Sequence, residues 1–195
     1  MTSSVLLTTL SLLYFFYWIC QLSFDTVDHS ILLSCLRDRF GVNGTAAAWF
    51  ESFLTSRTQF VRINDSRSTQ RSLERGVHQG SVLGPLLYLL YTSPIADIIK
   101  FHKLQYHLHA DDTQLYISFR TDCSYDLCLA KHRVECCVND IDCWMVNNGL
   151  KLNQDKTELV LISSKIRCRP SLEFIQVDET QTFRPKSGGD YRSES

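Results

Sequence analysis

His107-Leu108-His109-Ala110-Asp111-Asp112-Thr113-Gln114-Leu115-Tyr116-Ile117 is the stretch that decides the fold. Two adjacent carboxylates stand between two short runs rich in apolar and aromatic residues, which predicts a β-hairpin with the acidic pair at its turn. Neighbouring carboxylates also suit Mg²⁺, which proteins hold through a few carboxylates plus substrate phosphates. A pair of such ions can clamp both oxygens of an in-line phosphoryl displacement. On this stretch alone a second interpretation stays open, namely that Asp-Asp is only a favoured turn dipeptide.

The composition is that of a globular domain. The chain has 195 residues, of which 44% are hydrophobic, so one domain with a substantial core is expected. The net charge is −1 and the isoelectric point about 6.6. A free-standing nucleic-acid-binding domain is usually more basic, so any such role must rest on local patches. The eight cysteines form no Cys-x-x-Cys pair, so we expect no zinc site and reduced thiols in a cytosolic or nuclear protein.

The N-terminal segment, residues 1–23, carries no charge. Its apolar run at 5–22 is close to the length of a membrane span. No Lys or Arg precedes the run, so the positive region of a signal peptide is missing. Two interpretations stay open: a signal-anchor, or frameshifted or foreign sequence, and the codon argument below favours the second. We therefore expect a cytoplasmic or nuclear location rather than a membrane.

The remaining pattern predicts an α+β fold. Helical periodicity marks the segments 28–40, 45–54, 83–100 and 124–148, the third of which Pro94 should kink or split. Besides the acidic hairpin, extended segments are predicted at 57–63, 68–77 and 157–162. Arginines at 67, 71 and 75 could track phosphates, although a solvated strand face is the commoner explanation. This order favours helices packed on an antiparallel sheet.

Four blocks of the chain then form a recognisable set. They are Phe24-Asp25-Thr26-Val27-Asp28-His29-Ser30-Ile31-Leu32, Gly76-Val77-His78-Gln79-Gly80-Ser81-Val82-Leu83-Gly84-Pro85-Leu86-Leu87, His109-Ala110-Asp111-Asp112, and Leu150-Lys151-Leu152-Asn153-Gln154-Asp155-Lys156-Thr157-Glu158. In this order they resemble the palm of a reverse transcriptase of the non-LTR, LINE-type retrotransposons. His78 stands where proline is usual, and His109 replaces the tyrosine of the YADD box.

The resemblance implies a domain organisation. Residues 24–163 would form a polymerase-palm-like antiparallel sheet packed against helices, with fingers and thumb missing. Residues 164–195 would be an irregular, disordered tail. The partners of the family are an RNA template, a DNA primer and deoxynucleoside triphosphates. The alternative functions are a small membrane-anchored protein and a non-catalytic interaction protein that retains the palm fold.

The resemblance also implies a site for nucleotidyl transfer to a primer 3′-hydroxyl. Asp111 and Asp112 would be catalytic and would hold Mg²⁺. Lys156 would lie near the triphosphate as a proton donor, with a surface lysine as the alternative. Phe24 would be the aromatic gate under the sugar, with a core phenylalanine as the alternative. The incoming nucleotide and template would be contacted by Gln79, Gly80 and Ser81.

One residue breaks the family pattern. The first palm motif has a further Asp six residues before Asp25, and that position is Ile19. Isoleucine cannot ligate a cation, so we expect the chain to be catalytically inactive. In the neighbouring reading frame, the last base of the Trp18 codon and the first two of the Ile19 codon spell Asp. The surrounding codons add Leu-Leu before it and Leu or Met, then Ser or Pro, after it, which matches the first palm strand.

Overall fold

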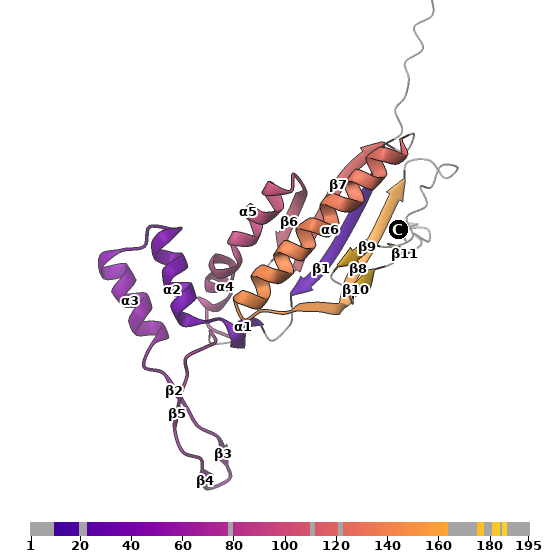
Figure 1. The fold of residues 1–195 in the computed structure, drawn as a ribbon. Coiled ribbons are helices and arrows are strands. Elements are labelled where there is room, and N and C mark those ends of the chain that lie inside the picture. The colour runs from indigo at the N-terminus through magenta and orange to yellow at the C-terminus, as the bar shows by residue number, and fades with distance from the viewer. Residues whose placement is uncertain are drawn as a thin grey trace, which may run out of the picture. The chain divides into compact units, whose positions relative to one another are not determined.

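The computed structural model describes residues 10–19, 23–77, 80–109, 112–120, 123–163, 175–177, 181–183 and 185–186. The chain divides into two compact units (Figure 1). The first unit comprises Met1–Ile19, Ile95–Cys143 and Leu152–Ser195, and the second comprises Cys20–Pro94 and Trp144–Lys151. Each unit is built from segments that are distant in sequence, so each depends on long-range packing rather than on local structure alone.

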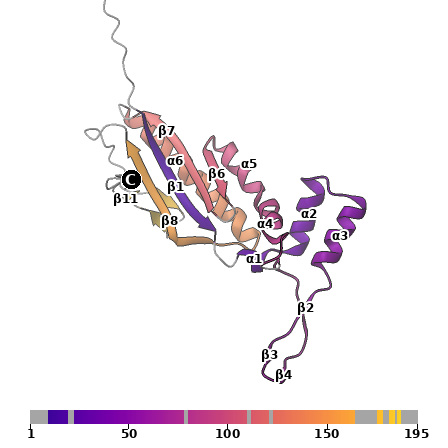
Figure 2. The same cartoon turned by 180° about the vertical axis from the view of Figure 1, so that it is seen from behind.

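The first unit is built on a five-stranded sheet in the order β11-β8-β1-β7-β6. Its strands are β1 (Leu10–Ile19), β6 (Gln105–His109), β7 (Asp112–Arg120), β8 (Leu152–Ser163) and β11 (Pro185–Lys186). All neighbours pair antiparallel except β11, which is parallel to β8. The long helix α6 (Ser124–Asn147) runs along one face of this sheet, as the two opposite views show (Figures 1 and 2). The first unit is thus helix on antiparallel sheet, as the sequence predicts.

The strand β1 occupies the centre of the sheet. Its sequence, Leu-Ser-Leu-Leu-Tyr-Phe-Phe-Tyr-Trp-Ile, is rich in aromatic residues that favour strands. It pairs with β7 on one edge and with β8 on the other, so its backbone groups are used on both sides. The apolar N-terminal run is therefore a strand over these ten residues. Among the residues described by the structure, no helix has the length and apolar character needed to cross a membrane.

Several predicted elements are confirmed. The acidic hairpin is β6–β7, paired antiparallel with His109 opposite Asp112, while Ala110 and Asp111 lie outside the described residues. The helix predicted at 83–100 is divided at Ser93 into α4 (Gly84–Thr92) and α5 (Pro94–Phe101), because proline cannot continue the hydrogen-bond ladder. The apolar stripe of α6 is buried at Ala130, Val134, Cys137 and Ile141. Two short strands, β9 (Ile175–Val177) and β10 (Gln181–Phe183), pair with each other.

The second unit contains helices and an exposed hairpin. Its elements are α1 (Ser23–Thr26), α2 (His29–Asp38), α3 (Gly44–Leu54), β2 (Thr58–Gln59), β3 (Arg62–Ile63), β4 (Ser66–Arg67), β5 (Arg71–Ser72) and α4. Its core is formed by fully buried side chains of α2, α3 and α4, namely Leu32, Leu36, Leu54, Leu87, Tyr88 and Tyr91. The segment Trp144–Lys151 joins this unit through Tyr91, whose hydroxyl donates to the carbonyl of Asn148 at 2.6 Å.

Asp28 fixes the start of α2. Its Oδ1 accepts hydrogen bonds from the backbone N–H of Ser30 (2.9 Å) and of Ile31 (3.3 Å), the donors that a helix N-terminus leaves without intrahelical partners. Its Oδ2 lies 3.6 Å from Nε of Arg75. The Ser30 hydroxyl, the two backbone N–H groups and the Arg75 charge lower the pKa of this carboxyl below its ordinary value, against an opposing effect of burial. Asp28 therefore stabilises the folded state in its ionised form.

We predict that Asp28→Ala lowers the free energy of unfolding by about 1 kcal/mol near neutral pH, because the N-cap is lost. The folded-state pKa lies below the unfolded value, so this contribution is complete above the unfolded pKa and is lost as pH falls through the folded pKa. Urea unfolding of both proteins over this range measures the difference. Asp38→Ala, at the other end of α2, is the control and should be neutral or slightly stabilising. An Asp28→Ala difference that persists in strong acid would contradict the ionised cap.

Candidate active site

The acidic hairpin brings Asp112 to one end of the central strand. Asp112 is the first residue of β7, opposite His109 of β6 and opposite Trp18 of β1. The residue is half-buried and its Oδ1 is buried, while the neighbouring Thr113 is only 2% exposed. The carboxylate is thus held against the sheet end rather than projecting from a free loop.

Ile19 is at the same end of the sheet. It is the last residue of β1, directly after Trp18, and it pairs with Leu152 of β8. The position where the resemblance places the first palm carboxylate is therefore next in sequence to the residue opposite Asp112. A chance resemblance in sequence would not require the segment that ends at Ile19 and the segment that begins at Asp112 to be neighbouring strands of one sheet.

Lys156 lies on the strand along the other edge of β1. Between Phe16 and Trp18 the pairing with β8 shifts from Glu158 to Asn153, so residues 154–157 form an irregular stretch opposite this part of β1. The backbone of Lys156 is in that stretch, and its side chain lies outside the described residues. The strand pairing consequently puts Asp112 and Lys156 on the two strands that flank the same end of β1.

In the second unit, the glycine-rich turn is bonded to the block that contains Phe24. The backbone N–H of Val77 donates to the carbonyl of Phe24 at 2.7 Å, and that of Gly76 donates to Val27 at 2.8 Å. The buried His29 donates from Nε2 to the carbonyl of Gly76 at 2.8 Å, since a carbonyl can only accept. These bonds join two blocks that are separated by nearly fifty residues in the sequence.

Gly76 permits this close contact. Its φ is +92°, a conformation that L-residues rarely adopt. A Cβ at this position would lie 3.1 Å from the carbonyl oxygen of Asp25 and 3.2 Å from its Cα, which are backbone atoms that cannot rotate away. The glycine is therefore needed both for its conformation and for its lack of a side chain.

The remaining predicted contacts have local packing roles in the second unit. Phe24 is half-buried with its ring 4.9 Å from that of Tyr88, which fits the core alternative as well as a gate. The Oγ of Ser81 accepts from the backbone N–H of Gly84 at 3.0 Å, at the start of α4. Gly80 is exposed with φ of +81°, and Gln79 lies outside the described residues. Their roles as nucleotide contacts stay a prediction.

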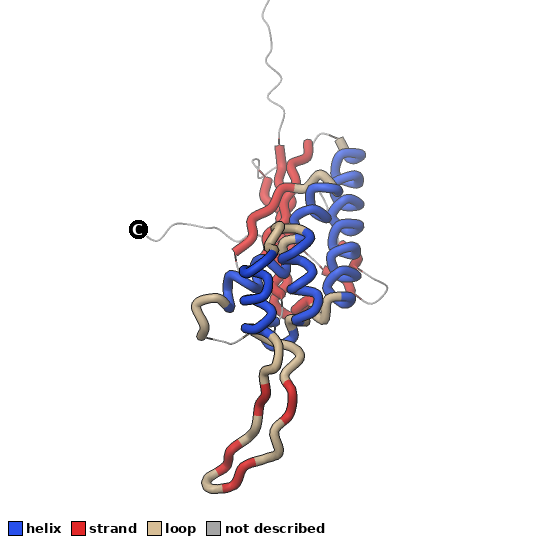
Figure 3. Tube along the Cα trace, turned by 90° about the vertical axis from the view of Figure 1, so that its left-hand side faces the viewer, coloured by secondary structure: helices blue, strands red, loops and turns tan. Residues whose placement is uncertain are grey.

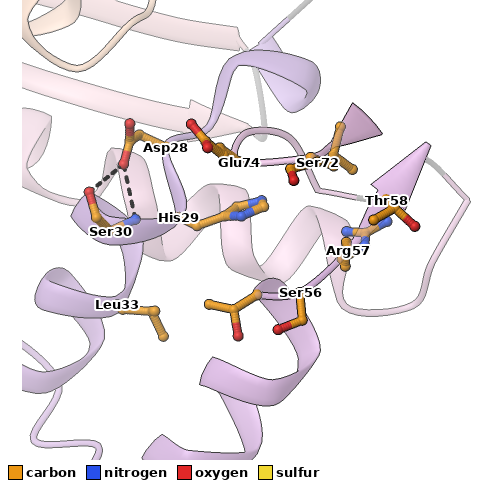
Figure 4. Close-up of a pocket in the computed structure, with 11 residues that line it drawn as sticks. Asp28, His29, Ser30, Leu33, Ser56, Arg57, Thr58, Ser72 and Glu74 are labelled. Atoms are coloured by element: carbon orange, nitrogen blue, oxygen red, sulfur yellow. Dashed lines mark hydrogen bonds between the residues drawn. The ribbon is translucent and has the colours of Figure 1, made fainter. Parts of the chain in front are cut away.

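The structure also reveals a cavity that the sequence did not suggest. It has a volume of about 510 Å³ and lies in the second unit, at the base of the exposed hairpin that contains β2 to β5. Asp28 and His29 line one side, and Ser56, Arg57 and Ser72 line the other (Figure 4). Nη1 of Arg57 is buried and has no hydrogen-bond partner within the described part of the chain. Arg57 also lines a second cavity of about 620 Å³. In the sequence, the only signal in this region is the high arginine content of residues 57–75, which does not predict a cavity.

The metal expectation meets a chemical obstacle. Among the described residues, no group of three or more His, Cys, Asp or Glu side chains is arranged to hold a metal ion. Asp111 is outside that set, so the decisive observation is the chemistry of Ile19, whose alkyl side chain has no donor atom. Ile19 therefore adds no oxygen ligand to those that Asp111 and Asp112 could supply.

We predict that Gly76→Ala destabilises the chain by more than the roughly 1–2 kcal/mol that a positive φ alone costs an L-residue, because the added Cβ also meets the backbone of Asp25. The matched control is Gly41→Ala, since Gly41 has φ of +66° but a Cβ added there would have no atom within 4 Å. Thermal unfolding of both variants measures the difference. Equal losses of stability would show that the contact with Asp25 is unimportant.

Comparison with known proteins agrees with this arrangement. Residues 20–184 match the family described as "Reverse transcriptase (RNA-dependent DNA polymerase)". Two Drosophila melanogaster proteins are similar, the probable RNA-directed DNA polymerases from transposon X-element (30% identity over 133 residues, 67% of this chain) and from transposon BS (31% over 142 residues, 70%). The chain spans only 14% and 15% of their respective lengths. The predicted LINE-type relationship is confirmed.

Solved structures support the fold. A telomerase from Candida tropicalis, in complex with a fragment of telomeric RNA, superposes with a TM-score of 0.61 at 13% identity, over 95% of this chain and 32% of that one. A telomerase from Candida albicans gives 0.58 at 14% identity, over 86% and 28%. At such identities the likeness shows the fold alone, and it confirms the α+β, partial-palm architecture. Together with the family match, these findings show that the chain belongs to the reverse transcriptase family.

Proposed function

We propose that this chain is a reverse transcriptase palm that keeps the fold of an RNA-directed DNA polymerase but does not catalyse nucleotidyl transfer. The observation that carries the proposal is the placement of Ile19 at the end of β1, directly after the residue opposite Asp112. The family match and the transposon relatives support the polymerase ancestry.

The chemistry of polymerisation explains why this substitution matters. Reverse transcriptases use divalent metal ions, which in a two-metal mechanism stabilise both the attacking and the leaving oxygen. Here Asp111 and Asp112 would be the remaining Mg²⁺ ligands, both supplied by one hairpin. Ile19 has no oxygen atom to offer a cation, so a bound Mg²⁺ would lack the third carboxylate of the family. We therefore assign no catalytic step to this chain.

The other predicted roles are proposed as remnants of the same site. Lys156 would have approached a triphosphate from β8, and Gln79, Gly80 and Ser81 would have faced nucleotide and template. Phe24 would have lain under the sugar. The family description names RNA, so RNA is the partner that we propose for this chain. A DNA primer and deoxynucleotides would be partners only of family members that catalyse polymerisation.

We further propose that Ile19 arose from a shift of reading frame. Because Trp has a single codon and every Ile codon begins with the same two bases, the overlapping triplet at Trp18-Ile19 must encode Asp. The overlapping triplets at Phe16-Tyr17 and Tyr17-Trp18 must both encode Leu. A small insertion or deletion near residues 22–23 would convert the family's first palm strand into the present β1.

The first prediction from this proposal concerns catalysis and metal binding. The recombinant chain should not extend a DNA primer on an RNA template in the presence of Mg²⁺. In Mn²⁺ titrations followed by electron paramagnetic resonance, Ile19→Asp should bind Mn²⁺ at least about tenfold more tightly than the native chain, because a third carboxylate completes the donor set.

The controls separate charge from folding. Asparagine has nearly the same shape as aspartate but no charge, so Ile19→Asn should not show the gain in Mn²⁺ affinity. Asp112→Ala, combined with Ile19→Asp, should abolish that gain. Circular dichroism verifies that each variant keeps its fold. Primer extension by the native chain that is lost in Asp111→Ala would refute the proposed inactivity.

A second prediction concerns the gene. Its nucleotide sequence should give a continuous first palm strand, with the Asp codon, when the frame upstream of Phe24 is restored. The reading frame of genomic DNA around the codons for residues 10–24 measures this directly. If no single insertion or deletion restores such a strand, the proposed origin of Ile19 is wrong, while the inactivity proposal is unaffected.

A further inference from the structure

The hairpin between α3 and the glycine-rich turn, residues 57–75, is the most basic segment of the chain, and we call it the basic arm. It contains five arginines against two acidic residues, Asp65 and Glu74, a net charge of +3 in a chain whose total is −1. The arm extends beyond α2 and α3 of its own unit and carries the strand pairs β2–β5 and β3–β4 between its loops (Figure 3). Its strand residues are all exposed.

The pairing within the arm places like charges together. Arg62 lies directly opposite Arg67 in the β3–β4 pair, and Arg71 lies opposite Gln59 in the β2–β5 pair. Like charges opposite each other destabilise a strand pair. An arm stabilised only by its own contacts would not favour this arrangement, whereas an anion bound between the two arginines would offset the repulsion.

No carboxylate of the described residues forms an ion pair with the arginines toward the tip of the arm. Within the described part of the chain, the arm's ion pair with a carboxylate is that of Arg75 with Asp28, at its base. Arg62 donates from Nε to the carbonyl of Asn64 at 3.1 Å, which leaves its charge uncompensated. The guanidinium of Arg67 lies 3.4 Å from the centre of the Phe60 ring, a contact that orients the charge without cancelling it.

The neighbouring side chains suit a phosphate and a base. Hydroxyl groups, which commonly donate to phosphate oxygens, are frequent in the arm: Thr58, Ser66, Ser68, Thr69 and Ser72. Phe60 is 43% exposed and Ile63 is 69% exposed, so apolar surface is available beside the arginines. An exposed aromatic ring next to a basic strand is the combination on which unpaired bases stack. At the base of the arm, Arg57 adds its buried Nη1 beside the cavity of Figure 4.

We propose that the basic arm binds single-stranded nucleic acid, with Arg62, Arg67 and Arg71 on the phosphodiester backbone and Phe60 against a base. The guanidinium fork pairs with phosphate oxygens in a bidentate manner, which an exposed lysine cannot reproduce. Backbone contacts carry no sequence information, so binding is independent of base sequence. The proposal does not depend on whether the palm is catalytically active.

The expected salt dependence follows from the number of contacts. Three phosphate contacts on a single strand give a slope of log affinity against log salt of about −2. Affinity should therefore fall about 20-fold between about 50 and 200 mM salt.

The test measures fluorescence anisotropy of a labelled, mixed-sequence, single-stranded RNA with the full chain. The arm variant is Arg62→Gln/Arg67→Gln/Arg71→Gln. The matched control is Arg37→Gln/Lys100→Gln/Lys103→Gln, which removes the same charge from exposed positions elsewhere. At low salt the arm variant should bind at least about 20-fold more weakly with a flattened salt slope, and the control should stay within about twofold.

Three further probes decide the nature of the partner. Single-stranded DNA of the same sequence should bind within about threefold of the RNA, because the contacts are to phosphates. Duplex RNA should bind more weakly, since its bases are not available to Phe60. Polyglutamate should not displace the RNA at equal charge. Equal losses in the arm and control variants, tighter binding of duplex, or displacement by polyglutamate would each overturn the proposal.

Discussion

The fold of the first unit depends on the pairing of β1 along both of its edges. Without β1, the hairpin β6–β7 and the strand β8 would have no common neighbour, because the sheet order places β1 between them. The residues that pair with β1 lie 94 to 110 positions later in the chain for β7 and 133 to 152 positions later for β8, so this pairing is a long-range constraint. It also fixes the register that sets Trp18 opposite Asp112, and it therefore determines which side chains could ever meet at the sheet end.

The second unit depends on a comparable close contact. The bonds from Gly76 and Val77 to the α1 segment, together with His29, hold the glycine-rich turn beside Phe24. Both units thus use backbone contacts to join motifs that are distant in sequence. Arg75, at the base of the basic arm, adds an ion pair with Asp28 to this junction, whereas the bonds that hold the turn beside Phe24 do not involve Arg62, Arg67 or Arg71.

Much of this could be predicted from the sequence because the signals are local. Pro94 predicted the division between α4 and α5, and apolar spacing predicted α6. The runs rich in apolar and aromatic residues on either side of Asp111-Asp112 predicted the hairpin. The role of the N-terminal run was harder to derive, since an apolar stretch of this length suits a membrane helix as well as a central strand, and only pairing partners distinguish them. The cavity beside Arg57 could not be foreseen, because it forms between α2, the end of α3 and the hairpin, which no local pattern relates.

The position of β1 has a consequence for how such a protein decays. A ladder of main-chain hydrogen bonds forms whichever side chain a residue carries, so the pairing of β1 does not itself require an acid at residue 19. The sheet accepts isoleucine at the position where the resemblance places an acid of the family. A scaffold of this kind can therefore exchange a side chain at its catalytic end without changing its architecture.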